Sequence, residues 1–67
     1  MAADGALDDA EIVAAAYAER VRDLFKVFAE AVYMGESERD AAARFRRGLI
    51  SARRAYVAAI EVLRDAG

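Results

Sequence analysis

The chain has no cysteine, no histidine and no proline among its 67 residues. Without cysteine it can form neither disulfides nor thiolate zinc sites. Without histidine it lacks the commonest metal ligand and the usual general base of enzymes. A chain this short buries little surface on folding, and small domains compensate with disulfides, a metal or oligomerisation. The composition therefore predicts a single domain over residues 1–67 that self-associates and carries no cofactor and no catalytic site.

Long hydrophobic runs are missing as well. Hydrophobic residues make up 58% of the chain, but 18 of its residues are alanine. The longest uncharged run in the first half spans residues 12–18, which is too short to cross a bilayer. The N-terminus lacks the basic start and apolar core of a signal peptide. We therefore expect a cytoplasmic protein with no membrane contact, and the excess of Ala and Arg suggests a bacterial source.

The apolar residues that are present recur at helical spacing in two segments, separated by Gly35-Glu36-Ser37. No proline interrupts either segment. The pattern predicts one helix over about residues 8–34, a turn at 35–37 and a second helix over about residues 38–65. Two helices of matched length joined by so short a turn form an antiparallel hairpin.

Capping residues mark the expected helix ends. Asp8 and Glu11 are spaced as a capping box for the first helix, and Leu7 stands where it can form a hydrophobic staple with Ile12. Gly35 is placed to end that helix in a left-handed conformation. Ser37 is placed to cap the second helix.

Each segment carries a heptad seam of small and apolar residues. The first seam comprises Ala10, Ala14, Tyr17, Val21, Leu24, Phe28 and Ala31, and the second comprises Ala42, Phe45, Leu49, Ala52, Tyr56, Ala59 and Leu63. Further apolar residues widen both seams, which is typical of a helix contacted from two sides. We therefore predict an all-α homodimer in which two hairpins form a four-helix bundle. Its candidate interface core is Phe25, Phe28, Val32, Phe45, Leu49 and Tyr56.

Ala41, Gly48 and Ala55 recur every seven residues along one edge of the second seam. A glycine inside a helix costs about 1 kcal/mol relative to alanine. Close packing against a neighbouring helix would explain Gly48, and a tolerated surface position is the alternative.

A cluster of five arginines without an intervening acid lies in residues 44–54. Arg46 and Arg53, and likewise Arg47 and Arg54, are seven residues apart and so form adjacent rows of one helix. These four are candidate contacts for an anion or a partner, and phosphate groups could lie along such rows. Alternatively they are solvated flanks whose stems cover the seam, or they pair with acids of another helix. The acidic balance, with a net charge of −2, weighs against nucleic acid.

The charge is divided unevenly between the two halves. Residues 1–34 carry a net charge of −4 and residues 35–67 carry +2. No nucleophile–base pair is present, since Ser51 has no base near it in sequence. The sequence therefore predicts a non-enzymatic protein–protein interaction module, such as a bacterial regulator, adaptor or accessory subunit. An RNA- or DNA-binding bundle that uses the arginine rows is the alternative.

Overall fold

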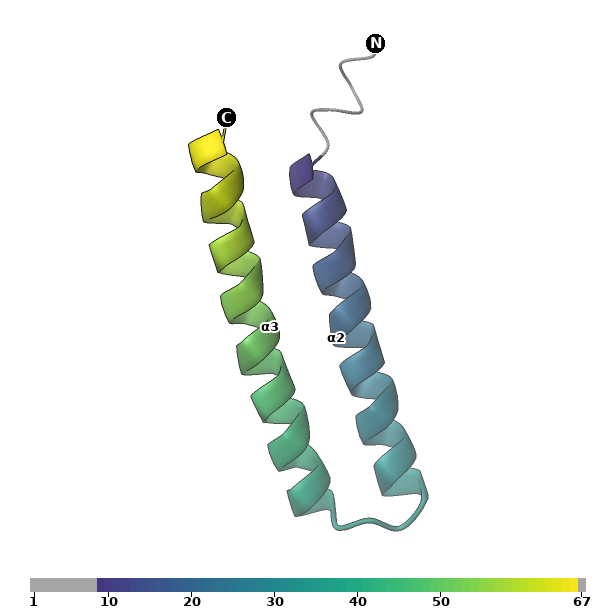
Figure 1. The fold of residues 1–67 in the computed structure, drawn as a ribbon. Coiled ribbons are helices and arrows are strands. Elements are labelled where there is room, and N and C mark those ends of the chain that lie inside the picture. Colours follow the sequence, from purple (N-terminus) through teal and green to yellow (C-terminus); the bar gives the residue numbers. More distant parts are fainter. Residues whose placement is uncertain (1–8, 67) are drawn as a thin grey trace.

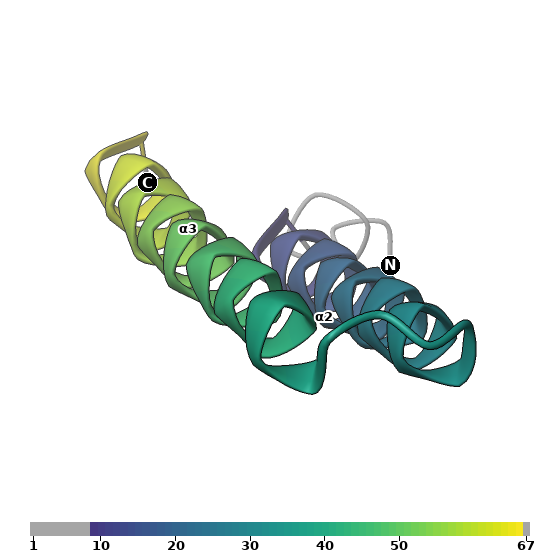
Figure 2. The same ribbon diagram turned by 90° about the horizontal axis from the view of Figure 1, so that it is seen from below.

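A computed structural model describes residues 9–66 as two helices and the turn between them. Helix α2 runs Asp9–Tyr33 and helix α3 runs Glu38–Ala66. The helices lie side by side and antiparallel as one layer (Figures 1 and 2), with Cα extents of 50 × 22 × 6 Å. The predicted all-α hairpin is confirmed. The cap and staple expected at Asp8 and Leu7 lie outside the described residues.

The turn is made by a left-handed glycine. Gly35 has φ 92°. Glycine adopts this left-handed conformation at little cost in free energy because it has no Cβ. The N–H of Glu36 donates to the carbonyl of Ala31 at 2.9 Å, and the N–H of Gly35 donates to that of Val32 at 3.1 Å. This pair of bonds is the Schellman motif, which satisfies carbonyls left over at a helix end. The predicted role of Gly35 is confirmed.

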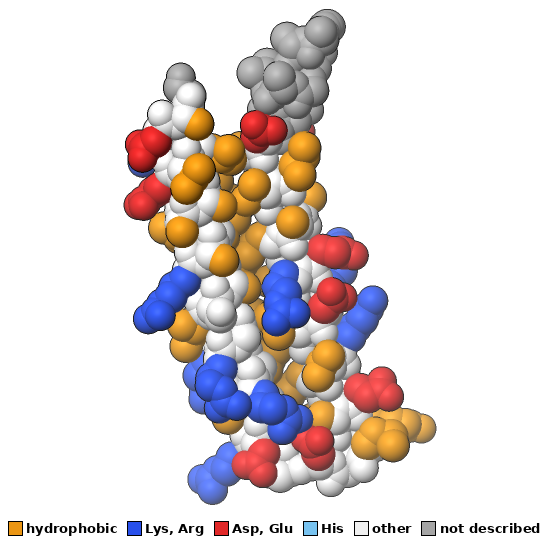
Figure 3. Space-filling model, in the orientation of Figure 1, with side chains coloured by type: hydrophobic (Ala, Val, Ile, Leu, Met, Phe, Trp, Pro, Cys, Tyr) orange, Lys and Arg blue, Asp and Glu red, His pale blue; other side chains and the backbone are white. Residues whose placement is uncertain are grey.

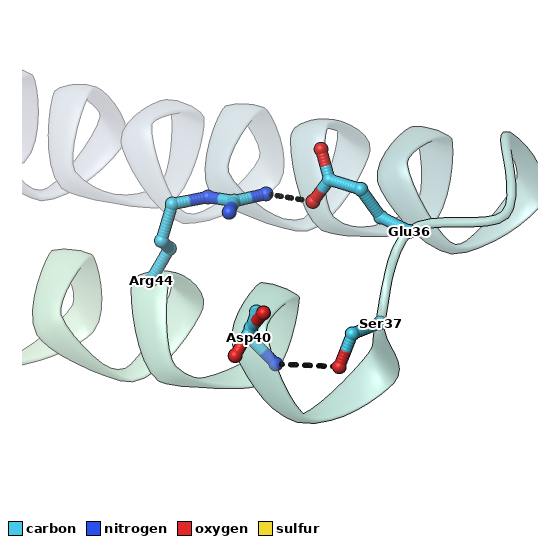
Figure 4. Close-up of polar contacts among 4 residues, drawn as sticks. All are labelled: Glu36, Ser37, Asp40 and Arg44. Atoms are coloured by element: carbon cyan, nitrogen blue, oxygen red, sulfur yellow. Dashed lines mark hydrogen bonds and ion pairs between the residues drawn. The ribbon is translucent and has the colours of Figure 1, made fainter.

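Helix α3 starts within two residues of that motif. The Ser37 hydroxyl oxygen accepts a hydrogen bond from the Asp40 N–H at 3.3 Å, as an N-cap does (Figure 4). Arg44, two turns along α3, forms an ion pair with Glu36 in the turn. The cap and the ion pair fix the direction in which α3 leaves the turn.

Aromatic pairs hold the seam between the helices. The rings of Tyr17 and Tyr56 lie 4.9 Å apart and are tilted by 31°, and those of Phe28 and Phe45 lie 5.2 Å apart and are stacked at 22°. Offset aromatic pairs at these separations are favourable. In both pairs the residue numbers add to 73, which defines the register of α2 against α3.

Gly48 lies at the edge of this seam and is closely packed. A Cβ built on it would stand 2.5 Å from Leu24 Cδ2, well inside van der Waals contact. Close packing, the first of the two interpretations of this glycine, is therefore confirmed. The contact is made within one hairpin.

The hairpin alone has almost no fully buried side chain. In the described part of the chain only Ala31 and Ala41 are buried, at 8% and 1% exposure. The larger seam residues are half-buried: Leu24, Phe28, Phe45, Leu49 and Tyr56. A single layer of two helices cannot cover them from both sides. Neither described helix is long and apolar enough to cross a membrane.

Candidate interaction surfaces

One face of the hairpin is hollowed along the seam, and we call it the grooved face. A hollow of about 400 Å³ lies between α2 and α3, and Figure 3 shows hydrophobic side chains gathered between the helices in its upper half. Its lining includes Val13, Ala16, Arg20, Gly48, Ser51 and Ala55. A second hollow, of about 260 Å³, continues it toward the turn and shares Arg20 with it.

The second hollow is lined by charged as well as apolar residues. Arg20, Asp23 and Arg44 line it together with Val27. Arg44 is already paired with Glu36. Among the described residues no acid lies within 4.0 Å of the Arg20 guanidinium, and the ion pairs formed there are Arg44–Glu36 and Arg22–Glu19.

The opposite side of the layer is the arginine face. Successive residues of a helix are about 100° apart, so Phe25, five positions after Arg20, lies on the other side of the α2 seam. Val32, seven residues further on, lies on the same side as Phe25. The same period places three arginines of α3 beside its seam on this side, at positions seven residues apart. They are Arg39, Arg46 and Arg53, with Ile50 and Val57 next to them.

The six candidate interface residues divide between the seam and the arginine face. Phe28, Phe45, Leu49 and Tyr56 lie in the seam, and the two aromatic stacks bring three of them into pairs within one hairpin. Phe25 is 56% exposed on the arginine face, and Val32 is half-buried near the turn. Ile50 and Val57 remain 45% and 55% exposed.

The four candidate anion contacts fall on two sides of α3. Arg46 and Arg53 lie on the arginine face, next to the seam, whereas Arg47 and Arg54 lie on the outer side of the helix. All four are exposed. In residues 9–66 none of them has an acidic partner within 4.0 Å. Their guanidinium groups are therefore available to a ligand or to a second chain.

Within residues 9–66 the acidic side chains are spread out, and no group of three or more could hold a metal ion. The Arg22 guanidinium donates to Glu19 Oε1 at 2.7 Å, but both side chains are more than 60% exposed. Exposed pairs of this kind contribute about 0–1 kcal/mol. The candidate interaction surfaces are therefore the grooved face and the arginine face.

Comparisons of the chain with known protein families, with characterised proteins and with solved structures find no match. Function must be argued from the faces themselves.

The sequence pattern did not reveal the groove. The sequence shows the heptad row of Ala41, Gly48 and Ala55. It does not show that Ala16 and Arg20 of α2 line the same hollow. A usable signal was present, since Val13, Arg20 and Val27 repeat every seven residues beside the first seam. Only the register of the hairpin shows that this row and the glycine row share one face.

Proposed function

We propose that this hairpin is a small, non-enzymatic protein–protein interaction module that acts as a homodimeric four-helix bundle. One observation carries the proposal: no large side chain of the described hairpin is fully buried, while Val27 and Met34, which follow one another along the grooved face, are 63% and 70% exposed. Burial of apolar surface drives association at about 25 cal/mol per Å². A second hairpin docked there would cover these side chains. A regulator, adaptor or accessory subunit in the bacterial cytoplasm is the role that fits such a module.

Sedimentation and melting test the assembly. The dimer should be present at micromolar concentration, and its melting temperature should rise with protein concentration, because mass action stabilises an oligomer. A monomer that melts at the same temperature over a hundredfold range of concentration would refute the dimer.

A nucleic-acid-binding bundle is the second candidate, and the exposed arginines of α3 favour it. Four exposed guanidinium groups without acidic partners among the described residues could contact phosphates. The net charge of −2 opposes it, because long-range attraction follows the whole charge distribution.

Fluorescence anisotropy with short labelled RNA and DNA separates the two candidates. The interaction module should show only weak attraction that disappears at about 150 mM salt, where charges are screened beyond about 8 Å. The matched variants are Arg46→Ala/Arg47→Ala/Arg53→Ala and Lys26→Ala, a cation away from the cluster. Binding that survives this salt and is lost only in the triple variant would make the nucleic-acid function correct.

A further inference from the structure

We infer that the second copy docks on the grooved face, about a two-fold axis perpendicular to the helices that passes beside Ser51. The inference rests on the proposed homodimer and adds the surface, the orientation and the register. The choice of face rests on the number of charged side chains that each face would bury in the core of a bundle.

The two faces differ in how many charges they would bury. When two layers stack, the residues beside each seam enter the core, and a buried charge is costly unless it is paired. The grooved face brings a single charged side chain per copy from these rows, Arg20. The arginine face brings four, namely Glu11, Arg39, Arg46 and Arg53.

Symmetry makes this difference decisive. A two-fold dimer uses the same surface on both copies, so like charges face like charges. Docking through the arginine face would gather six guanidinium groups and two carboxylates in the core rows. Docking through the grooved face gathers only two guanidinium groups there, and each needs an acid from the other copy.

Asp23 is that acid. It lines the same hollow as Arg20 and lies next to it on the grooved face. In an antiparallel pair of α2 helices whose two-fold axis passes between Val21 and Arg22, Arg20 of each copy faces Asp23 of the other. Two ion pairs then form across the axis, shielded between the layers.

The hairpin register carries the same axis to α3. Because the numbers of facing residues add to 73, the axis crosses α3 between Ser51 and Ala52. There Gly48 of one copy faces Ala55 of the other, and both residues line the groove. Their small side chains let the two α3 helices approach closely, at the level where the ion pairs form.

The alternative orientation leaves Arg20 without a partner. A two-fold axis parallel to the helices would set α2 against α3 of the second copy. It would not shift the copies along the helices, so residues would again face each other where their numbers add to 73. Arg20 would then lie at the level of residue 53, and the second copy's residues 50–56 contain no acid. They contain Arg53 and Arg54 instead.

The grooved face is also large enough. The Cα extents of 50 and 22 Å bound a face of at most about 1,100 Å² per copy, which leaves room for the roughly 800 Å² per partner of a standard interface. Docking here turns both arginine faces outward.

Single-cysteine cross-linking tests the axis, because the chain contains no cysteine of its own. Ser51→Cys should oxidise to a disulfide-linked dimer rapidly and nearly completely, since the two sulfurs meet beside the axis. The control is Ile50→Cys, the adjacent residue on the arginine face, which should stay unlinked under the same conditions. The reverse pattern would overturn the inference, and so would equal linking of both variants.

Charge exchange tests the register. Arg20→Asp should weaken dimerisation about tenfold or more, because it sets four carboxylates around the axis. Arg20→Asp/Asp23→Arg should restore it, since the pair forms again with its signs exchanged. Arg53→Asp, on the arginine face, should leave the dissociation constant unchanged. Failure of the double variant to recover, with circular dichroism showing intact helices, would refute the pairing.

Sedimentation of the unmodified protein distinguishes a failure of the proposed dimer from a failure of the docking geometry. A monomer refutes the proposed dimer itself. A dimer in which Ser51→Cys does not link refutes only the docking geometry.

Discussion

Gly48→Ala sets two effects of known size against each other. Alanine is favoured over glycine inside a helix by about 1 kcal/mol. Against this, the new methyl group would stand 2.5 Å from Leu24 Cδ2, 3.2 Å from Cδ1 and 3.4 Å from Cγ. Leu24 must therefore move its side chain out of the position that it holds against Gly48.

Overpacking of this kind costs about 1–3 kcal/mol, which equals or exceeds the gain in helix propensity. We therefore expect Gly48→Ala to lower the free energy of unfolding by about 1 kcal/mol, measured by urea denaturation at fixed protein concentration. In a Leu24→Ala background the obstructing atoms are gone, and Gly48→Ala should stabilise by about 1 kcal/mol. The sign of the effect should reverse between the two backgrounds. Stabilisation in both backgrounds would show that Gly48 is not closely packed against Leu24.

Three further changes test the turn and the seam by the same denaturation measurement. Ser37→Ala removes the hydroxyl that accepts the Asp40 N–H and should cost about 1 kcal/mol; no change would mean that Ser37 does not cap α3. Gly35→Ala should cost about 1–2 kcal/mol through backbone strain alone, because nothing lies within 4 Å of the new methyl group, and Gly35→Asn should cost less. Phe28→Ala should cost about 3 kcal/mol, the low end for core phenylalanines, because one hairpin only half-buries the ring; an unchanged transition would show that its stack with Phe45 contributes nothing.

The hairpin was predictable because its signals are local. Gly35 and Ser37 each act on the backbone within a few residues, through a left-handed glycine and a side-chain cap, and neither depends on the rest of the fold. The seams were predictable because helical periodicity determines which side chains share a face.

What could not be predicted depends on register between the helices. Nothing near Gly48 in sequence points to Leu24, because that contact joins residues on different helices. The same holds for the hollow that Arg20 and Ser51 line together. Val32, which the pattern places in the candidate interface core, is already half-buried within the single hairpin, close to the chain reversal.

The start of α2 and the end of α3 lie at the same pole of the hairpin, away from the turn (Figure 1). Anything attached at either position therefore leaves from one pole. In a dimer whose axis is perpendicular to the helices, the two chains' attachment poles point in opposite directions. With the axis between Val21 and Arg22 and a rise of about 1.5 Å per residue, the two Asp9 residues would lie about 38 Å apart along the helices. The assembly would act as a rigid spacer that holds two attached cargoes that far apart, at opposite tips. Fluorophores placed at Asp9 of both copies would report this separation directly by energy transfer.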